Sequence, residues 1–177
     1  MGEMSGNERI GRRVFRYDTV GSTMDVAWQL ADAGMKHGGA VVAKHQDAGR
    51  GRFARQWVSA TGDSLLVSVF VEPSPDTATV LSVMTALAVA DCCREIAQVS
   101  PKFKWPNDVL VDGRKIAGVL TEIRADTGGS VSAVIGVGLN VNLMFNDDIE
   151  LSQTATSLAE QTGRHYEIDL VETSFLA

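Results

Sequence analysis

Two apolar runs joined by one short turn limit the possible folds of this chain more than any other feature. In "VLVDGRKIAGVLTEIRAD", residues 109–126, Asp112 and Gly113 separate the two runs. An Asp-Gly pair in this position is a strong signal for a two-residue β-hairpin. A second turn, "TGGS", leads into "VSAVIGVGLNVNL", which is nearly all apolar and is therefore predicted to be a central strand. Consecutive hairpins favour an antiparallel or mixed sheet over a doubly wound parallel one.

Strands and helices alternate before these hairpins. Strands are expected at residues 13–20, 39–46 and 63–73. A helix is expected over residues 21–34, with Ser22 as N-cap, Asp25 completing a capping-box-like pair, and Gly34 as C-cap. One long helix is expected over residues 76–98, and a last helix near Asp169. The apolar residues expected on the buried face of the long helix are Val80, Leu81, Met84, Leu87, Ala88 and Ile96. The expected fold class is α+β, a mixed, largely antiparallel sheet backed by helices.

Length and charge narrow the possible partners. The 177 residues suit one domain, expected over residues 10–177 after a disordered lead-in at residues 1–9. The net charge of −6 argues against a nucleic-acid partner, because such domains are usually basic. The basic residues are local, which favours a small anionic ligand. No run approaches the ~18 apolar residues of a membrane span, and the first residues lack the apolar core of a secretory signal. Cys92 and Cys93 fall in an apolar helical pattern, which fits buried thiols and a cytoplasmic location.

Residues 49–57, "GRGRFARQW", are called the arginine loop below. Its first six residues fit G-x-G-x-x-A, a form of the dinucleotide-binding fingerprint, but no helical pattern follows, as that fold requires. A nucleic-acid patch is disfavoured because no wider basic surface is evident. The remaining interpretations are a solvated basic loop with a packed Trp57 and a cationic loop that closes over an anionic ligand. In the second, the glycines permit unusual backbone angles and the arginines supply forked donors; these residues are Gly49, Gly51, Arg50, Arg52 and Arg55.

A second group of polar residues follows in "KWPNDVLVDGRKIAGVLTE", residues 104–122. Lys104 and Lys115 bracket Asn107 and Asp108, which alone would suit a turn. Lys115 lies inside an otherwise apolar strand, so it either alternates into solvent or faces an anion inside a cleft. Gly118, three residues on, leaves room for a ligand to approach the backbone.

Four motifs occur in order: "STMD", "HQDAGRGRFARQW", "KWPNDVLVDGRKIAGVL" and "GVGLNVN". Together they resemble the catalytic domain of biotin protein ligase (biotin–[acetyl-CoA-carboxylase] ligase), over roughly residues 14–175. The resemblance implies a fold similar to that of the class II aminoacyl-tRNA synthetase catalytic domain. It also implies a two-step reaction, in which biotin and ATP give biotinyl-5′-AMP and pyrophosphate, and the biotinyl group then passes to a lysine of a biotin carboxyl carrier protein. The implied cofactors are ATP and Mg²⁺, the ion arriving with the ATP phosphates.

The resemblance also implies roles for individual residues. The catalytic residues would be Lys115, Arg52 and Arg55. The biotin-binding set would be Ser22, Thr23, Gln46, Gly49, Arg50, Gly51, Arg52, Trp57, Lys115 and Gly118. The set that binds ATP or the adenylate would be Arg52, Arg55, Trp57, Asn107, Lys115 and Asn140. Asp108 would position or deprotonate the lysine of the acceptor protein. The loop is expected to be mobile without ligand. No cluster with metal-ligand spacing is evident in the sequence.

The chain departs from the family pattern at Met24, where the family usually has Asn after Ser-Thr. The family's C-terminal β-barrel domain has no counterpart, so we expect a truncated chain, and no N-terminal helix-turn-helix segment is present to support repressor activity. The acceptor protein and the choice between monomer and homodimer stay open. Two alternatives remain: a lipoate ligase or lipoyl/octanoyl transferase, and a non-catalytic biotin or adenylate sensor or weakly active fragment. A transferase would need a nucleophilic cysteine near the site.

Overall fold

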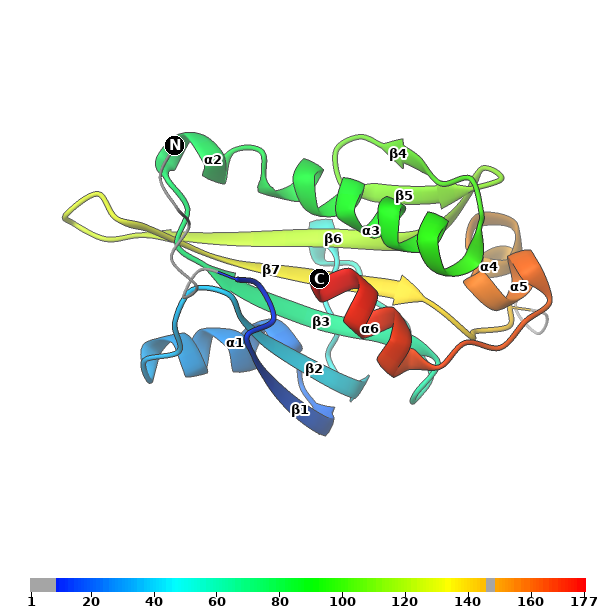
Figure 1. Ribbon diagram of the computed structural model, residues 1–177, viewed down its shortest axis with the longest axis horizontal. Coiled ribbons are helices and arrows are strands. Elements are labelled where there is room, and N and C mark those ends of the chain that lie inside the picture. The colour runs from blue at the N-terminus through cyan, green and yellow to red at the C-terminus, as the bar shows by residue number, and fades with distance from the viewer. Residues whose placement is uncertain (1–8, 146–148) are drawn as a thin grey trace.

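The computed structural model describes residues 9–145 and 149–177, which form one seven-stranded sheet flanked by helices (Figure 1). The strand order is β1-β2-β3-β7-β6-β5-β4. The strands are β1 (Arg13–Val20), β2 (Gly39–Gln46), β3 (Ser64–Val71), β4 (Lys102–Lys104), β5 (Asp108–Val111), β6 (Arg114–Ala125) and β7 (Val131–Asn140). Among the strand pairs of the described residues, β1 and β2 alone are parallel, which confirms the expected mixed, largely antiparallel sheet. Apart from Arg9, the expected disordered lead-in lies outside the described residues.

The predicted hairpin is confirmed. Asp112 (φ 48) and Gly113 (φ 79) both adopt positive φ between β5 and β6, as a type I′ turn requires. Strand β7 pairs with β3 on one side and β6 on the other, so the apolar segment is central as expected.

Helices cover the two faces of the sheet differently (Figure 1). Helix α1 (Thr23–Asp32) packs on one face against Val41, Phe70 and Val134. Helices α3 (Leu81–Ala97) and α6 (Ile168–Leu176) cover the other face, where the larger core lies. Ser22 caps α1 by accepting a hydrogen bond from the Met24 backbone N–H, as predicted. The Asp25 carboxylate does not complete a capping box; it binds Arg50 instead.

The helix predicted over residues 76–98 is wrong in two respects. It is two helices, α2 (Pro75–Ala78) and α3, separated by Thr79 and Val80. The expected buried face is also partly wrong, since Val80, Met84 and Leu87 are 44%, 54% and 47% exposed, and Ala88 is exposed as well. The face that packs on the sheet is instead built from Leu81 and mostly small residues, Ala86, Val89, Ala90, Cys92, Cys93 and Ala97. Small side chains let the helix approach the sheet closely, and the size of an apolar residue alone does not reveal this.

The short helices α4 (Ile149–Thr154) and α5 (Leu158–Thr162) were not predicted, because neither is long enough to show a helical period. Helix α5 carries local signals nevertheless: the Ser157 side chain caps its start, and Gly163 (φ 70) ends it. None of the helices in the described part of the chain is long and apolar enough to cross a membrane.

Candidate functional site

Three glycines leave part of the α1 face of the sheet without side chains, and this area is called the floor below. Gly118 of β6 lies opposite Gly138 of β7, and Gly136 lies two residues further along β7. A Cβ on Gly138 would lie 2.3 Å from a Trp57 ring carbon. A Cβ on Gly136 would lie 2.8 Å from the Met24 sulfur. Trp57 and Met24 can therefore lie directly on the sheet only because β7 carries no side chain at these two positions.

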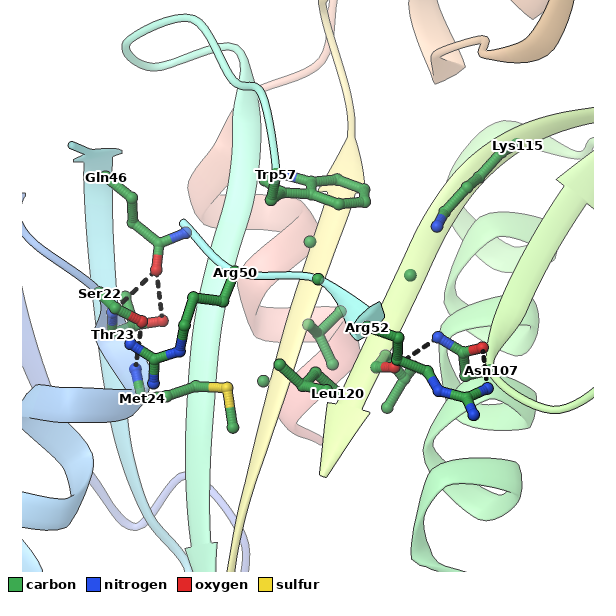
Figure 2. Close-up of a pocket in the computed structure, with 16 residues that line it drawn as sticks. Ser22, Thr23, Met24, Gln46, Arg50, Arg52, Trp57, Asn107, Lys115 and Leu120 are labelled. Carbon is green, nitrogen blue, oxygen red and sulfur yellow. Dashed lines mark hydrogen bonds between the residues drawn. The ribbon is translucent and has the colours of Figure 1, made fainter. Parts of the chain in front are cut away.

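The inner pocket lies above this floor, between α1, the arginine loop and β6 (Figure 2). Its polar and charged lining residues are Ser22, Thr23, Gln46, Arg50, Arg52, Asn107 and Lys115. Its remaining lining is Met24, Gly51, Trp57, Gly118, Val119, Leu120, Gly136, Val137 and Gly138. The lining is thus apolar along the floor and polar at both ends, as is usual for a site that orients a small ligand.

One end of the inner pocket is a fixed set of hydrogen-bonding groups (Figure 2). The Gln46 Oε1 accepts from the Thr23 backbone N–H at 2.8 Å and from its hydroxyl at 3.0 Å. The Thr23 hydroxyl also lies 2.8 Å from the hydroxyl of Ser68, which is buried on β3. Since both acceptor bonds hold Gln46 by its oxygen, its amide nitrogen is presented toward the pocket as a donor (Figure 2).

Lys115 lies at the other end of the inner pocket (Figure 2). Its Nζ is 2.7 Å from the Asp108 Oδ1 and 5.5 Å from the centre of the Trp57 ring. A Cβ on Gly118 would lie 3.0 Å from this Nζ, so Gly118 makes room for Lys115 and Trp57. The strand position of Lys115 therefore faces a cleft rather than bulk solvent, which resolves the choice that the sequence left open.

A second cavity, the outer pocket, begins where the inner pocket ends. Trp57 and Lys115 line both cavities. The outer pocket adds cationic side chains at Arg55 and Lys104 and the amide of Asn140. Its far wall comes from residues 151–155, which reach Lys115 because the Thr156 N–H donates to the Lys115 carbonyl at 2.9 Å. Asn140 is held there by its own bond, from Nδ2 to the Thr156 carbonyl at 2.9 Å.

The arginine loop is a compact turn above the inner pocket. The Trp57 N–H donates to the Gly49 carbonyl at 2.9 Å, and the Gly51 N–H donates to the Arg55 carbonyl at 2.7 Å. A single 3-10 turn, η1 (Arg52–Ala54), is followed by non-helical chain, which turns at residues 61–63 and enters β3. A dinucleotide-binding turn is therefore excluded for this stretch, since that motif opens a helix.

The three arginines of the loop have different surroundings. Arg52 donates to the Asn107 Oδ1 at 3.2 Å, and Asn107 is in turn fixed by its Nδ2, which donates to the Val119 carbonyl at 2.9 Å. Arg55 is exposed at the outer pocket. Arg50 forms a bidentate pair with Asp25, at 2.8 Å for both bonds, and reaches Glu122 at 3.1 Å. The hydrogen bond from Arg50 holds the pKa of the Asp25 carboxyl below its ordinary value.

The structure brings most of the predicted residues together, but in two cavities. Nine of the ten residues proposed to bind biotin line the inner pocket, and Gly49 is the exception. Gly49 lies outside both linings described here; a Cβ there would be 2.9 Å from the Trp57 carbonyl oxygen, so this glycine shapes the loop. Asn107, expected beside the adenylate, lines the inner pocket, whereas Asn140 lines the outer one.

Sequence reasoning missed several residues of the site. The floor glycines Gly136 and Gly138 carried a signal, since a glycine at every second position clears one face of a strand. Ser68 carried none, because one serine in an apolar strand usually has a structural role. The carboxylates Asp25 and Glu122 could not be assigned to Arg50 without knowing that α1 and β6 meet beside the loop.

We expect Gly138→Ala to displace Trp57, because the added Cβ would lie 2.3–2.8 Å from atoms of its ring. Overpacking of this kind costs ~1–3 kcal/mol. Thermal unfolding should show this loss, and tryptophan fluorescence should show a changed Trp57 environment. Gly21→Ala is the matched control, since nothing lies within 4 Å of its added Cβ. Equal unfolding temperatures for the two variants would contradict the predicted clash between the added Cβ and the Trp57 ring.

Comparison with known proteins points to one family. A sequence model described as "Biotin/lipoate A/B protein ligase family" matches residues 17–140. The "Bifunctional ligase/repressor BirA" of Bacillus subtilis is 38% identical over 163 residues, which are 88% of this chain and 49% of that protein. The "Biotin--[acetyl-CoA-carboxylase] ligase" of Mycobacterium tuberculosis is 35% identical over 147 residues, 79% of this chain and 52% of that protein. The chain thus spans about half the length of these curated relatives.

Solved structures agree with the sequence matches. The biotin protein ligase from Aquifex aeolicus, in complex with biotin and ATP, superimposes with a TM-score of 0.79 at 30% identity. The match covers 93% of this chain and 67% of that one. This likeness confirms the expected fold, that of a biotin-ligase catalytic domain of the class II aminoacyl-tRNA synthetase type.

Proposed function

Because this chain belongs to the biotin/lipoate A/B protein ligase family, we propose that it activates biotin with ATP and transfers it to a lysine of a biotin carboxyl carrier protein. In the first step, a biotin carboxylate oxygen attacks the α-phosphorus of ATP and pyrophosphate leaves. In the second step, the lysine amine attacks the carbonyl of biotinyl-5′-AMP, AMP leaves, and the amine loses a proton. The outcome is an amide between biotin and the carrier protein.

One observation carries this proposal: two cavities of different chemistry meet at Lys115 and Trp57. The inner pocket ends in the Thr23–Gln46–Ser68 hydrogen-bond set, which suits the ureido group of biotin because that group both donates and accepts. The outer pocket offers Arg55, Lys104 and Asn140, which suit a nucleotide. The two reacting groups would therefore meet beside the Lys115 ammonium.

The first step brings two anions together, and that approach is repulsive without cations between them. Lys115 lies where a biotin carboxylate and an α-phosphate would meet, and Arg52 borders the same end of the inner pocket. Positioned cations of this kind stabilise the charge that develops on the phosphoryl oxygens. Arg55 would act from the outer pocket on the nucleotide.

Asp108 belongs to the same site through its contact with Lys115 at 2.7 Å. We propose that this carboxylate holds the Lys115 ammonium at the junction and lies beside the path of the incoming acceptor lysine. A carboxylate in that place would orient the attacking amine and accept its proton.

Magnesium is proposed to accompany the ATP phosphates rather than to occupy a protein cage. Across residues 9–145 and 149–177, no three His, Cys, Asp or Glu side chains are grouped as ligands for an ion. Mg²⁺ commonly keeps several waters and binds through substrate phosphates with few protein ligands, which fits this site. Its chemistry would be to neutralise the charge of the phosphates that leave as pyrophosphate.

The transferase alternative finds no support at Cys92 and Cys93. Both lie on α3, across the sheet from the inner pocket. Burial raises the pKa of the Cys93 thiol to about 12, so this thiol is not a ready nucleophile. A lipoate ligase remains the second candidate, because the family description includes lipoate. The polar set at Thr23 and Gln46 favours biotin, since a dithiolane ring offers no comparable hydrogen bonds.

We propose that residues 10–177 act as one catalytic domain in the cytoplasm, and that monomer and homodimer are both compatible with the site, since every residue named for it comes from one chain.

Pyrophosphate release tests the proposed function. With ATP and Mg²⁺ present, we expect release to depend on added biotin and to stop when a chelator removes the metal. Lipoate in place of biotin should give little release. Release with lipoate and none with biotin would favour the second candidate. Calorimetric binding of biotin without any pyrophosphate would indicate a sensor rather than an enzyme.

A further inference from the structure

The side chain of Arg50 points away from the floor of the inner pocket and toward α1 (Figure 2). Its two terminal nitrogens donate to both Asp25 oxygens at 2.8 Å, and one of them also donates to Glu122 at 3.1 Å. The Arg50 backbone meanwhile belongs to the loop, where it bridges to Gln56. One residue thus joins the arginine loop to α1 and β6.

One of the two carboxylates that receive Arg50, that of Glu122, is itself held in place. The second oxygen of Glu122 accepts from the Trp28 indole N–H at 2.9 Å. Arg124 stacks over Trp28, with its guanidinium carbon 3.8 Å from the ring centre, and pairs with Asp32 at 3.4 Å. A fixed acceptor such as Glu122 loses little conformational freedom when Arg50 binds it, which strengthens the contact.

The local charge argues against Arg50 as a site for an anion. Asp25 and Glu122 together carry two negative charges against the single positive charge of Arg50. A carboxylate or phosphate gains little from a cation that is already neutralised in this way. Arg52, by contrast, donates to the uncharged Asn107 amide, so its positive charge stays available for a ligand.

We infer that Arg50, Asp25 and Glu122 are positioning residues that hold the arginine loop over the inner pocket. This loop clamp rests on the proposed function for its biochemical meaning, because the loop backbone and Trp57 would enclose biotin there. Arg50 and Arg52 anchor neighbouring positions of the loop to opposite walls of the pocket. Loss of the clamp therefore detaches the loop from one of these walls. The clamp acts through the position of the loop, not through contact with the reacting atoms.

The ion pairs of the clamp favour the closed position of the loop but are weak enough for the loop to open. The side chains of Arg50, Asp25 and Glu122 are 39%, 52% and 35% exposed, so solvent screens their attraction. Exposed ion pairs of this kind change an equilibrium by up to about fivefold each. Removing both carboxylates should therefore shift loop opening by roughly tenfold.

The test uses Asp25→Asn, Glu122→Gln and the double variant, which keep shape and remove charge. Chymotrypsin cleavage at Phe53, which is 82% exposed at the loop, should accelerate by roughly tenfold in the double variant without any ligand. The KM for biotin in pyrophosphate release should rise by a similar factor, with kcat within about twofold. Asp25→Glu keeps the charge, so its cleavage rate and its KM for biotin should both stay close to those of the parent.

Asp91→Asn is the matched control, since it removes an exposed carboxylate that pairs with Arg94 on α3 and touches none of the clamp residues. The proposal is overturned if the double variant keeps the parent's cleavage rate and KM, or if cleavage rises equally along the whole chain, which would indicate general destabilisation. Faster cleavage at Phe53 in a protein that makes no pyrophosphate would support the clamp and reject the proposed function, so the two failures can be told apart.

Discussion

Lys115→Met should lower biotin-dependent pyrophosphate release by about 100- to 1,000-fold, the usual effect of removing one group that stabilises developing charge. Lys115 lines both cavities and lies where the two anionic substrates would meet. Methionine keeps the apolar stem beside Trp57 and removes the charge, so packing is largely preserved. Single-turnover release of pyrophosphate, with both substrates saturating, measures the effect.

Lys102→Met provides the control for this experiment. Lys102 is exposed on β4 and belongs to neither cavity lining. We expect that variant to match the parent. A Lys115→Met protein that is folded and retains release within a few-fold of the parent would show that the charge at the junction is not needed.

Arg52→Gly should let biotinyl-5′-AMP escape before transfer. The Arg52–Asn107 hydrogen bond at 3.2 Å joins the arginine loop to the wall of the inner pocket beside Lys115. A glycine removes this bond and adds backbone freedom, so the loop should no longer keep water and the activated intermediate apart. We expect the intermediate to leave about 10- to 100-fold faster, the size of effect that one lost charged hydrogen bond produces. Filter retention of labelled adenylate measures its loss.

Escaped intermediate should also biotinylate lysines of an unrelated bystander protein, which Western detection with streptavidin would reveal. Arg164→Gly is the control, because Arg164 is exposed between α5 and α6 and lies outside both cavity linings. If Arg52→Gly holds the adenylate as long as the parent does, Arg52 does not close the site.

Much of the fold could be predicted because its strongest local signals agree. The Asp112-Gly113 turn and the apolar run of β7 together require an antiparallel centre, and the structure has one. The long helix was predicted less well, because Val80, Met84 and Leu87 are large and apolar but exposed. Their burial depends on which face of α3 meets the sheet, and a single sequence does not determine that face.

The residues of the candidate site could likewise be predicted only in part. Lys115 could be identified from the sequence because a lysine inside an apolar strand is unusual. The structure explains its position, since Lys115 lines the inner pocket. Arg50 was grouped with Arg52 because the two are alike in sequence. Only their surroundings separate them, since Asp25 and Glu122 come from α1 and β6 and meet Arg50 in space. Residue types therefore identified the cationic loop, while long-range contacts decided what each cation does.

We propose that the two cavities joined at Lys115 together form activated biotin and then transfer it. Mass spectrometry of a biotin carboxyl carrier domain, incubated with this protein, biotin, ATP and Mg²⁺, tests it most directly. We expect the domain to gain the mass of one biotinyl group on one lysine, only when both biotin and ATP are present. A carrier domain of unchanged mass, with this protein folded and saturated with both substrates, would contradict it.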